Sequence, residues 1–85
     1  MAFEIKIKPL VLYDLEDRIK FQENQLAGAG RRFYQNFLTE LSELQLHNSN
    51  TVSVYESVQK YATKTISCEL FYIITGETIF VMGLL

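Results

Sequence analysis

The residues that offer the most chemistry gather in the second half of the chain, where tyrosines stand among lysines and a glutamine. They are Tyr55, Gln59, Lys60, Tyr61 and Lys64. Lysine ammonium groups hold phosphates and tyrosine rings stack on unpaired bases, so this composition would suit single-stranded RNA. The same side chains also occur as ordinary residues of a strand, where the tyrosine rings pack on the sheet and their hydroxyl groups remain exposed to solvent. The pattern alone favours this plainer interpretation.

The chain holds one histidine and one cysteine, which cannot build the usual zinc sites. His47 stands in a polar run and is interpreted as a solvated surface residue. Cys68 stands at an alternating strand position, where a cysteine behaves as a small buried hydrophobe. Nothing in the sequence places these two residues side by side as a nucleophile and its base. We therefore expect no metal, no cofactor and no cysteine nucleophile.

Length and charge predict one small domain, residues 1–85, with a single core. With ten acidic and eight basic side chains the chain is slightly negative, which argues against a protein that binds nucleic acid over its whole surface. The first residues lack a long apolar segment, so we expect no secretory signal and a cytoplasmic protein. Glu69 and Glu77 interrupt the apolar stretch 66–85, which favours a soluble hairpin over a membrane span.

That hairpin is the clearest structural signal. Two runs rich in β-branched and aromatic residues, Ser67–Ile74 and Thr78–Leu85, flank Thr75-Gly76-Glu77. Apolar residues occupy both alternating faces of each run, so one face must meet the core and the other must meet something else. The hairpin therefore implies a partner and predicts that the isolated chain self-associates.

The first half of the chain reads as a strand followed by two helices. Apolar residues alternate in the strand and recur every three or four residues in the helices. They are Phe3, Ile5 and Ile7 in the strand, Leu12, Leu15 and Ile19 in a helix that starts near Pro9, and Phe33, Phe37, Leu41 and Leu44 in the second helix. Gly28-Ala29-Gly30 should turn the chain between the helices, and lacks the spacing of a phosphate loop.

A polar loop at His47–Asn50 should lead to a third strand between Tyr55 and Thr65, so the order is strand, helix, helix, strand, strand, strand. This order predicts an α+β domain in which a helical hairpin covers one face of an antiparallel sheet. The opposite face is left for solvent, a target or a binding protein.

With its elements in this order, the chain resembles the RelE/ParE family of bacterial type II toxin-antitoxin toxins, also called plasmid-stabilisation proteins. Phe3–Ile7 and Tyr13–Asp17 are similar to the family's first strand and the acidic helix after it. Gly30–Leu38 is similar to its second helix, Ile66–Tyr72 stands where the family often has Phe-Pro-Tyr and apolar residues, and Thr75–Val81 resembles its closing turn and last strand.

The departures from this family fall on its functional positions. Gln59 stands near the place where many members open the third strand with arginine, and the polar tail that often follows the last strand is missing after Leu85. In RelE-like ribonucleases such basic and tyrosine residues supply charge stabilisation and acid-base chemistry. Only weak catalytic candidates remain, namely Lys60, Tyr61, Lys64 and Tyr72.

The resemblance therefore implies a toxin that is ParE-like or catalytically degenerate and is neutralised by a cognate antitoxin, which typically adds a helix and a strand to its toxin. DNA gyrase is the implied target ahead of the ribosome and mRNA, and a homo-oligomer is a further expectation. Two alternatives stay open: a RelE-like ribosome-dependent mRNA endonuclease, and a non-toxic protein-interaction module of the same fold.

Overall fold

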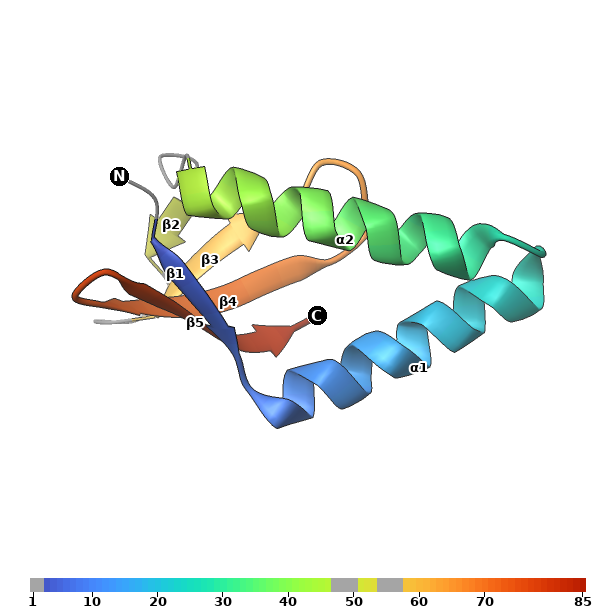
Figure 1. Ribbon diagram of the computed structural model, residues 1–85, viewed down its shortest axis with the longest axis horizontal. Coiled ribbons are helices and arrows are strands. Elements are labelled where there is room, and N and C mark those ends of the chain that lie inside the picture. Colours follow the sequence, from blue (N-terminus) through green and yellow to red (C-terminus); the bar gives the residue numbers. More distant parts are fainter. Residues whose placement is uncertain (1–2, 47–50, 54–57) are drawn as a thin grey trace.

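Seven elements make up the chain in the computed structural model, which describes residues 3–46, 51–53 and 58–85, with the backbone alone at 51–53. In chain order they are β1 (Glu4–Ile7), α1 (Pro9–Gln25), α2 (Ala29–Leu46), β2 (Thr51–Ser53), β3 (Gln59–Ala62), β4 (Glu69–Thr75) and β5 (Thr78–Leu84). Figure 1 shows the helical hairpin on one side of the sheet, with α2 lying along it and α1 diverging from α2 toward the end of β5. The expected α+β class is confirmed.

Over the described ranges the sheet has five strands in the order β1-β5-β4-β3-β2, and two of its details differ from the expectation. β1 pairs with β5 in parallel, so the sheet is mixed rather than antiparallel. The helices are followed by four strands instead of the expected three, because the short strand β2 precedes β3 and pairs with it. Three residues are too few to show a period of two, and the direction in which distant strands pair leaves no local pattern in the sequence.

The core lies between α2 and the inner face of the sheet, and the apolar stripe of α2 is buried as predicted. Phe33, Phe37, Leu41 and Leu44 are buried, with Phe37 only 1% exposed. The expected phase of α1 was wrong at Leu12, which is 49% exposed, because Val11 and Leu15 form the buried turn. Pro9 begins this helix at its first turn, where its fixed φ fits and its missing N–H costs no hydrogen bond.

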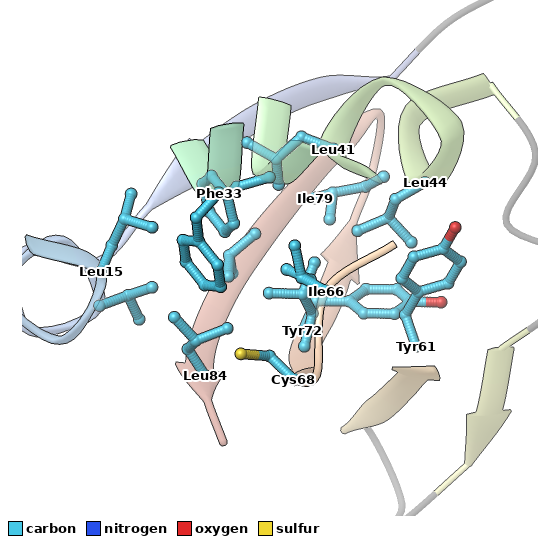
Figure 2. Close-up of a cluster of buried hydrophobic side chains, with 14 residues drawn as sticks. Leu15, Phe33, Leu41, Leu44, Tyr61, Ile66, Cys68, Tyr72, Ile79 and Leu84 are labelled. Carbon is cyan, nitrogen blue, oxygen red and sulfur yellow. The ribbon is translucent and has the colours of Figure 1, made fainter. Parts of the chain in front are cut away.

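The sheet adds its side chains to this core at every second position. Leu70, Tyr72, Ile79 and Val81 are fully buried beneath α2, as is Tyr61 from β3. Figure 2 shows Tyr61 and Tyr72 among these core residues, with Phe33 between Leu15 and Leu84 at the other end. Gly76 takes a φ of 62° in the turn between β4 and β5, as the glycine in the predicted hairpin requires.

The glycines between the helices have different roles. Gly28 turns the chain with a φ of 87°, whereas Gly30 lies inside α2, where α1 and α2 come closest. A Cβ atom on Gly30 would stand 2.7 Å from the carbonyl oxygen of Ile19. The carboxylate of Glu23 accepts hydrogen bonds from the backbone N–H groups of Gly28 and Gly30, which lower the pKa of Glu23. These contacts close the helical hairpin at its tip.

Within the described residues, neither helix combines the length and the apolar composition needed to cross a membrane.

Replacing Phe37 with alanine should lower the free energy of unfolding by about 3–5 kcal/mol, because it leaves a cavity beneath α2. Its neighbour Leu38 is 43% exposed, so Leu38→Ala serves as the matched control and should change stability by about 0.5 kcal/mol at most. Chemical denaturation measures both variants. Similar losses in the two, or a loss below about 1 kcal/mol for Phe37→Ala, would contradict the burial of this stripe.

Candidate functional site

A cleft of ≈ 830 Å³ opens between the two helices and the end of the sheet. Figure 1 shows the C-terminal end of β5 pointing into the angle between α1 and α2. The walls of the cleft come from α1, α2, the loop after β3 and the last residues of the chain. Its polar and aromatic lining includes Asp14, Asp17, Arg18 and Phe21 from α1, and Arg32, Phe33 and Asn36 from α2.

One wall of this cleft is the loop after β3, which α2 holds through Glu40. The carboxylate of Glu40 is 2% exposed and accepts four hydrogen bonds. The donors are the backbone N–H groups of Lys64 at 2.9 Å and Thr65 at 2.7 Å, the Thr65 hydroxyl at 2.6 Å and the Tyr61 hydroxyl at 3.1 Å. A buried carboxylate is costly unless it is satisfied in this way, so the loop must keep this position for the fold to be stable.

The same contacts set the protonation states around the loop. Burial alone would raise the pKa of Glu40, but the hydrogen bonds from Thr65, Lys64 and Tyr61 outweigh it and lower the pKa. Burial and the adjacent Glu40 carboxylate raise the pKa of Tyr61 to about 12. Glu40 is therefore ionised and Tyr61 is a neutral hydrogen-bond donor at neutral pH.

The next residues of this wall are tied to both the loop and α1. The Thr63 hydroxyl donates to the carbonyl oxygens of Ile66 at 2.6 Å and Cys68 at 2.5 Å. Arg18 places Nη1 3.2 Å from the sulfur of Cys68. Cys68 is buried, as expected, and burial raises the pKa of its thiol despite the opposing effect of Arg18.

The weak catalytic candidates are not gathered into one site. Tyr61 and Tyr72 lie in the core on the inner face of the sheet. Lys60 lies on the outer face, because it neighbours Tyr61 in β3, and its Nζ is 3.1 Å from a carboxylate oxygen of Glu69. Lys64 stands in the loop, exposed to solvent.

Two further residues of the sequence-based hypotheses, Tyr55 and His47, lie outside the described residues. Gln59 opens β3 and is partly buried. Of the lysines and tyrosines that suggested RNA binding, the described ones, Tyr61, Lys60 and Lys64, are thus divided between the core, the outer face and a loop.

The sequence interpretation missed Glu40, Arg18 and Arg32. Glu40 had a visible signal, because it lies three residues after Phe37 and four before Leu44, inside the apolar stripe of α2. A charged residue at such a position needs a buried partner. The arginines had no comparable signal, since they join the cleft only through the angle between the helices.

The cleft combines an exposed aromatic ring with charged side chains of both signs. It presents the aromatic ring of Phe21, which is 61% exposed, beside acidic and basic side chains. Among the described residues, Arg18 and Arg32 form no ion pair, and no three histidine, cysteine or acidic side chains stand close enough to share a metal ion.

No family model, curated protein or solved structure significantly matches this chain.

The hydrogen bonds of Glu40 predict a pH-dependent stability. Because its pKa is lower in the folded chain than the ordinary value of 4.5, its contribution is complete above that value and is lost as the pH falls through the folded-state pKa. Glu40→Gln removes the charge and should cost about 1–3 kcal/mol at neutral pH. The difference in the free energy of unfolding between the wild type and Glu40→Gln should become smaller as the pH is lowered.

Denaturation midpoints between about pH 7 and pH 3 measure this effect. Glu43→Gln, on the exposed side of the same helix, is the control, and its stability should depend on pH as that of the wild type does. If the difference in stability between the wild type and Glu40→Gln stays constant with pH, the Glu40 charge does not hold the loop.

Proposed function

We propose that this chain is the toxin component of a bacterial type II toxin-antitoxin pair, similar to the RelE/ParE family, and that a cognate antitoxin neutralises it. The motifs that carry the sequence resemblance fall on β1, α1, α2, β4 and β5 in the expected order. This agreement of order supports the proposal.

The observation that carries the proposal is the cleft together with the apolar side chains exposed on α1, the helix that forms one of its walls. Leu10 and Tyr13 on α1 are 71% and 67% exposed, and Phe21 of the same helix lines the cleft. A helix with an apolar face bordered by charges would cover these residues and pair with the arginines and aspartates of the walls. The short edge strand β1 also offers backbone groups on the side away from β5, to which a partner strand can add.

The toxin acts in the ParE-like manner or is catalytically degenerate, and it does not cleave mRNA. Metal-free cleavage needs a base, a cation for the developing charge and an acid for the leaving oxygen. The hydroxyl of Tyr61 is buried and committed to Glu40, and Lys60 is paired with Glu69. These contacts count against cleavage of the message on the ribosome, which leaves DNA gyrase as the proposed target and a non-toxic interaction module as the remaining alternative.

Primer extension on messages from bacteria that express the chain alone tests this function. Messages should remain intact while growth stops and plasmid DNA becomes relaxed. The Phe37→Ala chain, whose core is weakened, is the control for overproduction without a folded toxin and should spare growth.

Two results would contradict the proposal. Codon-phased cuts that disappear in Lys60→Ala or Lys64→Ala would establish the RelE-like endonuclease instead. Normal growth with intact messages and supercoiled plasmids, from a chain shown to be folded in the cell extract, would leave only the non-toxic module.

A further inference from the structure

Arg18 stands on the side of α1 that lines the cleft. It is partly buried, and its Nη1 lies 3.2 Å from the sulfur of Cys68. A thiol is a weak acceptor, whereas a guanidinium group carries five N–H donors and a permanent positive charge. The contact with Cys68 therefore fixes the direction of the Arg18 side chain but does little to balance its charge.

The helix itself offers Arg18 a carboxylate with which it does not pair. Asp14 precedes Arg18 by four residues, the spacing at which an acidic and a basic side chain pair along a helix. Glu16 and Lys20 have the same spacing and order on α1, and their charged groups lie 3.1 Å apart. Within the part of the chain that the structure describes, Arg18 forms no such ion pair. A ligand in the cleft therefore meets an arginine whose charge no acidic side chain there has bound.

Arg32, the other basic residue of the cleft walls, stands nearer to an acidic side chain. Hydrogen bonds from Gly28 and Gly30 lower the pKa of Glu23, and the positive charge of Arg32 acts in the same direction. Glu23 therefore offsets part of the charge of Arg32 at the tip of the helical hairpin. Arg18 is the better placed of the two arginines to bind an anionic ligand.

The charges around the cleft favour a carboxylate over a phosphate. Its lining includes two acidic and two basic side chains, which give the walls no net charge: Asp14, Asp17, Arg18 and Arg32. A phosphate group with up to two negative charges, or a nucleic acid with many, needs a positive field that these walls do not provide. A carboxylate carries a single charge and fits the fork of an arginine with two parallel hydrogen bonds.

We infer that Arg18 binds an acidic side chain, aspartate or glutamate, of the segment that occupies the cleft. The identity of this segment as part of an antitoxin rests on the proposed function, whereas the preference for a carboxylate rests on Arg18 and the charges around it. The exposed ring of Phe21 on the same wall would pack on the aliphatic part of that segment. A cleft of ≈ 830 Å³ has room for more than the carboxylate alone.

An NMR titration of the chain with N-acetylglutamate α-amide tests this preference. The probe carries a glutamate side chain without backbone charges, and N-acetylglutamine α-amide is its matched neutral control. At low ionic strength the glutamate probe should shift the Nε–H signal of Arg18 and the methyl signals of Ile66 and Leu84, which line the cleft. The glutamine probe should leave these signals in place. Ile73, which neighbours the buried Tyr72 in β4 and so lies on the outer face of the sheet, should respond to neither probe.

Two variants assign the effect to one arginine. Arg18→Gln removes the charge but keeps a side-chain donor, and it should weaken binding of the glutamate probe by about tenfold or more. Arg31→Gln is the matched control, because it removes the same charge from an exposed position of α2 outside the cleft lining. It should bind the probe as the wild type does. Methyl spectra without a probe show whether each variant is folded.

Equal shifts from the two probes, or no shifts at all, would overturn the inference on the unaltered chain and without any variant. Binding that Arg18→Gln retains in full would do the same. Inorganic phosphate that shifts the Arg18 signal at a lower concentration than the glutamate probe would assign the arginine to phosphate ligands instead. Because the titration contains no antitoxin, its failure rejects the carboxylate preference alone, whereas failure of the growth test rejects the toxin function.

Discussion

The buried carboxylate of Glu40 is the constraint that links the two halves of this protein. A carboxylate at 2% exposure must have its oxygen atoms satisfied, and within the described part of the chain every hydrogen bond to it comes from β3 or the loop that follows. The position of α2 over the sheet thereby sets the position of residues 64–65. Those residues lead into the wall of the cleft, so the site depends on a charge that lies outside it.

The period of two in the strands explains why the sheet has two different surfaces. Tyr61 and Tyr72 point inward and contribute their rings to the core, while Lys60 and Phe71 point outward. This separation takes the tyrosine hydroxyls away from any substrate on the outer face. It also leaves the apolar side chains of the hairpin partly exposed there, as the sequence of its two strands led us to expect.

Local signals in the sequence predicted the elements well and their long-range relations poorly. The spacing of Phe33, Phe37, Leu41 and Leu44 predicted the buried side of α2, and Gly76 marked the turn of the hairpin. The parallel pairing of β1 with β5 joins residues about seventy positions apart, which no local period can reveal. The role of Gly30 was likewise hidden, because it depends on the carbonyl oxygen of Ile19 across the helical hairpin. The cleft could not be predicted for the same reason, since it exists only where α1, α2 and the end of β5 meet.

An antitoxin that covers the cleft between the helices is the central element of the proposed function, and methyl NMR of the labelled chain tests it most directly. The titrant is a candidate antitoxin encoded next to the gene of this chain. Signals of Ile66 and Leu84, which line the cleft, should shift at stoichiometric addition, while that of Ile73 on the outer face should not. No binding, or shifts at Ile73 with Ile66 and Leu84 unchanged, would contradict the account.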